Sequence, residues 1–188
     1  MLPVVSLCVV AQDARLAGCN ENFEKWHGRG NLLWASGHGL QWREARASGT
    51  GVEMALLLCD GKAVGPSQLL RSPYDFSAVD LFMASACLLG KIPGSAAFGS
   101  IVRAFNATLA LRGCRRVTSA LWELADESAL VFSENYMRAI LKHGFTQRRS
   151  SHSYAMAYVD AMKSFRCYDD GRFDNDFFWA PFTHYGLG

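Results

Sequence analysis

An alternation of apolar strands and amphipathic helices over the second half of the chain constrains the fold more than any other feature of the sequence. The alternation predicts a strand over 79–89, a helix over 96–112, a strand over 117–124, a helix over 128–143 and a last strand over 153–159. The first helix is the clearest element, because its apolar residues recur at three- and four-residue spacings and a glycine follows it. This order of elements predicts a layered α/β fold in which helices pack on a sheet.

The first half of the chain gives fewer signals. Residues 4–10 are apolar and mostly β-branched and predict a buried strand, whereas 14–26 predict a helix. Two further runs, 54–59 and 62–70, are joined by Asp60-Gly61, a dipeptide typical of tight β-hairpin turns. We therefore expect an antiparallel hairpin between the opening elements and the alternating half.

Composition excludes several classes of protein. Of the 188 residues, 50% are hydrophobic and 19% are charged, which excludes an intrinsically disordered chain. The net charge of +2 is too small for the basic surface that nucleic acid or an anionic membrane requires, and no apolar run has the length of a transmembrane helix. The six cysteines are scattered without a zinc or disulfide spacing, so we expect reduced core thiols, no bound metal and a cytoplasmic protein.

The segment between the strand at 79–89 and the helix after it has the composition of a ligand-binding loop. Gly90 and Gly94 allow close approach of the backbone, and Lys91 adds a positive charge. Ser95 is placed to cap the helix, whose N–H groups suit a phosphate. A strand-to-helix turn that needs glycine only for its geometry explains the same residues, so both interpretations stand at this point.

The run Lys91-Ile-Pro-Gly94-Ser-Ala96 resembles the pyrophosphate-binding loop of the GNAT N-acetyltransferases, in which Gln or Arg usually occupies the first position. The run 133–145 resembles the family's later helix, which closes on a Gly-Phe pair. The expected hairpin at 56–70 and the strand and helix at 4–16 are similar to its central and opening elements. The chain thus resembles a divergent member of this family over most of residues 4–160.

The resemblance implies a mixed, mostly antiparallel central sheet that splays in its middle and is flanked by helices. It also implies acetyl-CoA as cosubstrate and an unidentified small-molecule or protein amine as acceptor, which attacks the thioester directly. The residues that it assigns to cofactor binding are Ala86, Leu88, Lys91, Ile92, Pro93, Gly94, Ser95, Ala96 and Ser133.

Two residues are expected to carry the acid–base chemistry of such an enzyme. Asp80 is the candidate base that helps to deprotonate the amine, with Glu53 and Glu123 as alternatives. Ile140 occupies the position at which many GNAT enzymes carry a tyrosine acid, and Tyr136, one helical turn earlier, is the candidate substitute. The missing tyrosine leaves a second interpretation open, a catalytically lapsed GNAT-like protein with a binding or structural role, for example in a phage virion.

Other arrangements of reactive residues carry less weight. The sequence has no Gly-x-Ser-x-Gly elbow, although the residue types needed for a Ser/His/Asp or Cys/His arrangement are present. The histidines show no metal-ligand spacing and are read as packed or surface residues. They are His27, His38, His143, His152 and His184.

The sequence divides into a GNAT-like domain over 1–162 and a C-terminal extension over 163–188. The extension is rich in aromatic residues, among them Phe177, Phe178 and Trp179. Such a large apolar surface is unfavourable in water, so we expect the extension to pack on its own domain or on a second copy of the chain. A homodimer is slightly favoured, because symmetric dimers are the commonest oligomers.

Overall fold

The computed structural model describes residues 9–10, 32–46, 49–57, 63–73, 75–77, 79–90, 104–143 and 151–186. The strands are β1 (Val9–Val10), β2 (Leu32–Ser36), β3 (His38–Arg46), β4 (Gly49–Leu57), β5 (Ala63–Val64), β6 (Leu81–Ser85), β7 (Arg116–Ala120) and β8 (Phe182–Gly186). The helices are α2 (Pro66–Arg71), α3 (Phe105–Leu111), α4 (Asp126–Lys142), α5 (Ser151–Arg166) and α6 (Asp176–Trp179).

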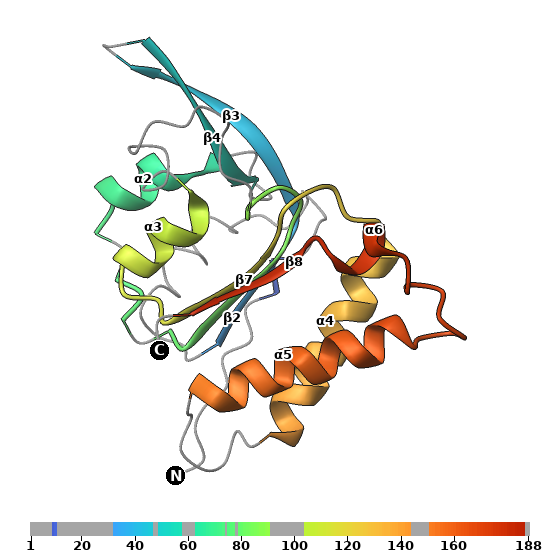
Figure 1. Ribbon diagram of the computed structural model, residues 1–188. Helices are drawn as coiled ribbons and strands as arrows, with labels where there is room; N and C mark the ends of the chain where they lie inside the picture. Colours follow the sequence, from blue (N-terminus) through green and yellow to red (C-terminus); the bar gives the residue numbers. More distant parts are fainter. Residues whose placement is uncertain are drawn as a thin grey trace.

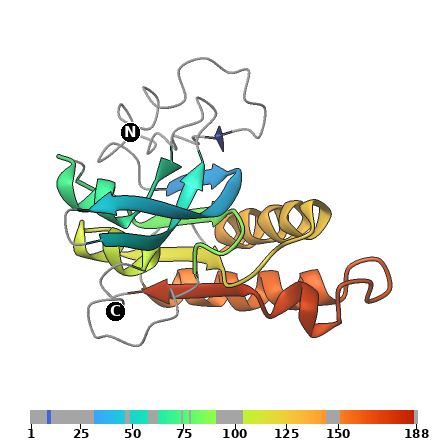
Figure 2. The same ribbon diagram turned by 90° about the horizontal axis from the view of Figure 1, so that it is seen from above.

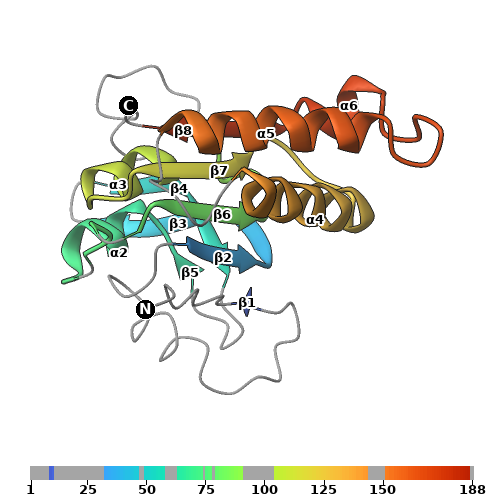
Figure 3. The same cartoon turned by 90° about the horizontal axis from the view of Figure 1, so that it is seen from below.

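The strands form two sheets (Figure 1). One sheet has five strands in the order β1-β2-β6-β7-β8, and the other has three strands in the order β3-β4-β5. In the five-stranded sheet β1, β2, β6 and β7 are parallel, and β8 runs antiparallel to β7 at one edge. Figure 2 shows β8, in red, at this edge. Figure 3 shows the arrowheads of β2, β6 and β7 at the same end of the sheet, beside α4.

Alternating side chains of the central strands enter two cores, one on each face of the five-stranded sheet. Leu33 of β2 and Phe82 of β6 pack with apolar residues of β4, α2 and α3. Leu32 and Met83, their neighbours in sequence, pack on the other face with α4 and α5. Figure 1 shows the two pairs of helices on opposite sides of the sheet. Burial of both faces is typical of parallel strands, and the alternation is the two-residue period of a strand.

The expected α/β class is confirmed, since mixed and antiparallel sheets are flanked by helices. The expected GNAT arrangement with a mostly antiparallel central sheet is not observed, because among the described residues antiparallel pairing in that sheet is confined to β7 and β8. Parallel neighbours need a crossover connection, and α3 lies in the connection between β6 and β7.

Several elements occur where the sequence predicts them. β6, α3, β7 and α4 overlap the segments expected as strand, helix, strand and helix, and β4 pairs with β5 as an antiparallel hairpin. The expected helix over 14–26, most of the strand over 4–10 and residues 96–103 lie outside the described residues.

The strand expected over 153–159 is wrong, because this segment belongs to helix α5. Its alternation of aromatic and small residues has the period of a strand over a short window. Over the whole helix, however, the buried residues recur at helical spacings. They are Tyr154, Ala157, Ala161 and Phe165.

The strand expected over 62–70 is also shorter than predicted. It ends at Val64, and helix α2 begins at Pro66. Proline at the first position of a helix is favourable, because its fixed φ suits the helix and its missing N–H costs nothing there. Gly65 precedes it in an extended conformation and donates its N–H to Oε1 of Gln68 at 3.0 Å.

The C-terminal segment is part of the second core. Phe165, Phe173 and Phe182 are all buried there, and β8 completes the five-stranded sheet. Helix α5 runs across the boundary expected at residue 162. No helix in the described part of the chain is long and apolar enough to cross a membrane.

Candidate active site

Two parallel strands of the central sheet end side by side, and each is followed by a residue suited to nucleophilic catalysis. Ser36, the last residue of β2, is the register partner of Ser85, the last residue of β6. His38 comes two positions after Ser36, and Cys87 comes two positions after Ser85. Because the carboxyl ends of parallel strands lie at one edge of a sheet, this register places an imidazole and a thiol at the same edge.

Backbone contacts continue the register beyond the ends of the strands. The N–H of Gly37 donates to the carbonyl oxygen of Ser85 at 3.2 Å. A Cβ built on Gly39 would lie 1.6 Å from the carbonyl oxygen of Cys87, so no side chain fits at this position. Gly39 therefore lets the segment that carries His38 lie directly against the backbone of Cys87.

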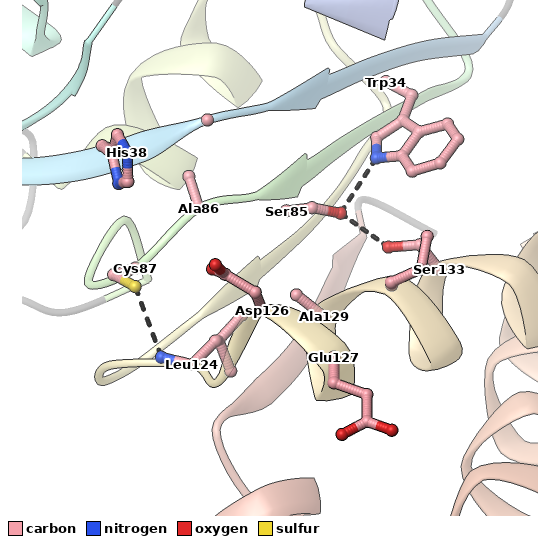
Figure 4. A pocket seen from close by; sticks show the side chains of 12 residues that line it. Trp34, His38, Ser85, Ala86, Cys87, Leu124, Asp126, Glu127, Ala129 and Ser133 are labelled. Carbon is pink, nitrogen blue, oxygen red and sulfur yellow. Dashed lines mark hydrogen bonds between the residues drawn. The ribbon is translucent and has the colours of Figure 1, made fainter. Parts of the chain in front are cut away.

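A cavity of about 350 Å³ lies at this end of the sheet (Figure 4). Figure 4 shows His38, on β3, and Cys87, in the turn after β6, at one side of it. The other lining residues are Trp34, Gly37, Ser85, Ala86, Leu124, Asp126, Glu127, Ala129, Leu130 and Ser133. The cavity thus combines a thiol and an imidazole with hydroxyls, carboxylates and apolar walls.

The segment after β7 holds the thiol in place. The backbone N–H of Leu124 donates to Sγ of Cys87 at 3.3 Å. Leu88, the next residue after the thiol, has a φ of 64°, in the left-handed region that is unfavourable for a residue with a side chain. Backbone strain of this kind persists where the surrounding structure fixes a turn, here the turn over 87–90 that begins at Cys87.

Hydrogen bonds along one wall join the sheet to helix α4. Nε1 of Trp34 donates to Oγ of Ser85 at 2.9 Å, and Oγ of Ser85 lies 2.6 Å from Oγ of Ser133. Ser133 is buried, whereas Trp34 and Ser85 are partly exposed. The two hydroxyls therefore give this wall a neutral, polar character.

Two successive carboxylates occupy the first turn of α4 and line the cavity. Figure 4 shows the carboxylate of Asp126 on the side of the helix that faces Ala86, whereas that of Glu127 is directed the opposite way. Both oxygens of Glu127 accept hydrogen bonds from the guanidinium of Arg172, at 2.7 and 2.6 Å. The two acidic residues therefore differ in direction.

The residues expected to carry acetyl transfer lie elsewhere. Asp80 precedes β6 at its amino end, opposite to the cavity, and its Oδ1 lies 2.9 Å from Nη1 of Arg115. Tyr136 is fully buried, with its hydroxyl 3.3 Å from Nδ1 of His184, and burial raises the pKa of this hydroxyl. Neither residue lines the cavity described above.

The fold also shows where the two alternative bases lie, and where Ile140 lies in place of the expected tyrosine. Glu53 is buried in β4, where it accepts a hydrogen bond from the N–H of Ser67 at 3.0 Å. Glu123 is exposed between β7 and α4, and Ile140 belongs to the second core. Within the described ranges, no group of three or more His, Cys, Asp or Glu residues could hold a metal ion.

Of the residues expected to bind acetyl-CoA, Ala86 and Ser133 line the cavity, and Leu88 lies in the turn after Cys87. The rest form the segment 91–96, which lies outside the described residues.

Neither His38 nor Cys87 was expected from the sequence to belong to a site. The cysteines were interpreted as core thiols and the histidines as packed or surface residues. A signal was nevertheless present. Gly37-His38-Gly39 directly follows one apolar run, and Ala86-Cys87 directly follows another.

Comparisons with known proteins bear on the fold of the chain. No protein-family model and no curated protein matches the chain. Among solved structures it is similar to the Arg-specific cysteine proteinase gingipain R, with a TM-score of 0.55 and 10% sequence identity over 89% of this chain. The chain spans 34% of the length of that protein. The likeness shows the fold, and it overturns the resemblance to GNAT acetyltransferases together with the transferase class that rested on it.

Proposed function

We propose that the protein is a cysteine peptidase in which Cys87 is the nucleophile and His38 the general base. The observation that carries the proposal is the register of β2 and β6, whose last residues are partners and whose extensions line one cavity with His38 and Cys87. A thiol beside an imidazole is the pair that thiol-dependent attack on an amide requires.

In the proposed reaction the imidazole of His38 accepts the proton of the Cys87 thiol, and the thiolate attacks the carbonyl carbon of a peptide bond. The C–S bond forms, the C–N bond breaks, and the imidazolium returns the proton to the leaving amine. A water molecule, deprotonated by His38, then attacks the thioester. This step releases the carboxylic acid product and restores the thiol.

Three observations support the assignment. The N–H of Leu124 faces the sulfur at 3.3 Å and offers a fixed dipole to its negative charge. The contact of Gly39 with the backbone of Cys87 fixes the spacing of the segments that carry the two groups. Gingipain R, whose fold this chain shares, is itself a cysteine proteinase.

Covalent labelling tests the assignment directly. We expect a mixture of peptidyl chloromethyl ketones to add one peptidyl group to Cys87, as located by mass spectrometry of the digested protein. Cys87→Ala should abolish this addition, and His38→Ala should slow it by roughly 10²-fold or more. Cys167→Ala is the matched control, because that thiol is exposed and does not line the cavity.

Two outcomes would contradict the proposal. One is modification of Cys167 as fast as that of Cys87, which would indicate ordinary thiol reactivity. The other is labelling of Cys87 that does not depend on His38.

The resemblance that implied acetyl transfer from acetyl-CoA to an amine is overturned, but the reaction itself is untested and stays a prediction, as does the alternative of a lapsed protein that only binds. The homodimer and the cytoplasmic location also stay predictions. Calorimetric titration with acetyl-CoA tests the cofactor separately, because saturable binding is not expected of a peptidase.

A further inference from the structure

We propose that the cavity accepts an uncharged, apolar side chain from the residue on the amino side of the cleaved bond, and that Ala129 and Leu130 of α4 form the wall that recognises it. The inference rests on the proposed peptidase function and adds to it a substrate class. Both residues line the same cavity as Cys87. The side chain next to a carbonyl under attack by Cys87 would therefore lie against them.

The cavity extends from the thiol to an indole ring. Figure 4 shows Cys87 on one side of it and Trp34 on the other. The indole is held in place, because its Nε1 donates to Oγ of Ser85 at 2.9 Å and its ring packs against the second core. The volume of about 350 Å³ falls within the range of sites for small ligands. A side chain that extends away from the thiol therefore meets a fixed aromatic surface.

Leu130 exposes apolar surface at this cavity. Its exposed fraction is 54%, whereas Val131, the next residue of α4, is buried. Ala129 beside it has only a methyl group and is partly exposed, so it leaves the volume in front of it open. An apolar side chain in the cavity would remove the surface of Leu130 from water, which is favourable.

The polar lining residues already have partners. Oγ of Ser85 lies 2.6 Å from Oγ of Ser133, and both oxygens of Glu127 accept hydrogen bonds from Arg172, at 2.7 and 2.6 Å. Asp126 also has an interaction of its own. Among the described residues that line the cavity there is no lysine or arginine. A charged side chain would lose its water here without gaining a free counter-charge, which is unfavourable.

The test compares peptide substrates that differ only in this one residue, which is norleucine, alanine, lysine, glutamine or glutamate. Norleucine and lysine are the decisive pair, because their side chains have similar length and differ in the terminal charge. We expect kcat/KM for norleucine to exceed that for lysine and for glutamate by roughly 10²-fold, and that for glutamine by about 10-fold or more.

Variants assign this selectivity to the wall of α4. Leu130→Ala should reduce the ratio of kcat/KM for norleucine to that for alanine by about 10-fold, because part of the apolar contact is lost. Ala129→Leu should reduce the same ratio by filling the cavity. Leu141→Ala is the matched control, since Leu141 lies on the same helix and is 63% exposed but does not line the cavity. Circular dichroism checks that each variant is folded.

The outcomes separate this inference from the function on which it rests. If peptidyl probes label Cys87 but lysine or glutamate is preferred to norleucine, the inference fails and the peptidase assignment stands. The inference also fails if folded Leu130→Ala changes kcat/KM for norleucine and alanine by the same factor, or changes neither. If no peptidyl probe or substrate reacts in a Cys87-dependent way, both proposals fail.

Discussion

The α-carbon of Gly39 lies against the carbonyl oxygen of Cys87, so closely that an added methyl carbon would come within 1.6 Å of that oxygen. The neighbouring Gly37 has ordinary space, since its nearest contact would be the carbonyl oxygen of Leu57 at 3.5 Å. Two glycines on either side of His38 thus face very different constraints. Alanine substitutions at the two glycines therefore test the contact between the segments that carry His38 and Cys87.

We expect Gly39→Ala to separate the segments that carry His38 and Cys87, because a backbone carbonyl cannot move aside as a flexible side chain can. The loss of stability should be about 1–3 kcal/mol, as for other overpacked sites, and Cys87 labelling by peptidyl probes should be nearly abolished. Gly37→Ala should keep both properties close to those of the wild type. Equal behaviour of the two variants, in urea unfolding and in labelling, would contradict the contact.

Tyr136→Phe tests the catalytic role that the sequence suggested for this residue. Because the hydroxyl is buried in the second core and points at His184, we expect its removal to leave Cys87 labelling and peptide turnover within about threefold of the wild type. The free energy of unfolding should fall by about 1 kcal/mol, the typical contribution of one hydrogen bond. A large loss of turnover in a folded variant would instead restore Tyr136 as a catalytic residue.

His184 makes stability depend on pH. Its ring stacks on Tyr158, its Nδ1 lies 3.0 Å from Oγ1 of Thr118, and burial lowers its pKa from 6.5 to about 4. The unfolded chain therefore binds the proton at a higher pH than the folded chain does. The stability that neutral His184 contributes is complete above pH 6.5 and is lost as the pH falls towards 4.

We expect this group alone to remove about 2–3 kcal/mol of unfolding free energy between pH 7 and pH 4. Urea unfolding at several pH values measures the loss, to which carboxylates also contribute. His184→Phe retains an aromatic ring without the titrating group, so the fall in stability over this range should be smaller by that amount. An identical fall in the variant and the wild type would contradict the assignment.

Phe173 and Phe177 separate core aromatics from surface aromatics in the C-terminal segment. Phe173 is 2% exposed and stacks on Phe165 with ring centroids 4.8 Å apart, whereas Phe177 is 57% exposed. We expect Phe173→Ala to cost about 3–5 kcal/mol and Phe177→Ala less than about 1 kcal/mol in thermal or urea unfolding. Similar losses from the two substitutions would mean that this segment packs differently.

Elements with a strong and long periodic pattern were predictable from the sequence. Helix α4 lies where its apolar spacing places it, because a helix of this length buries one continuous stripe. Helix α5 was missed because the window at 153–159 is too short to separate a period of two from one of 3.6. The order of strands in the sheet could not be predicted from the sequence, since β2 pairs with β6 through contacts between residues that are far apart along the chain.

The same limit explains why the candidate site was missed. His38 and Cys87 are far apart in sequence, and the apolar runs that precede them do not show that the two residues meet. They come together only through the parallel pairing of β2 and β6, in which Ser36 and Ser85 are partners. The local sequence indicates where a strand ends, but the strand order of the sheet determines which strand ends lie side by side.

The position of β8 in the chain has a consequence for biosynthesis. Phe182 stacks on Phe132 of α4 with ring centroids 3.9 Å apart, and its carbonyl oxygen accepts a hydrogen bond from the hydroxyl of Tyr158 at 2.7 Å. On the ribosome, α4 and α5 are made before β8, so these aromatic rings stay uncovered until residues 182–186 emerge. A nascent chain that stalls before this strand therefore presents the exposed apolar surface that chaperones bind.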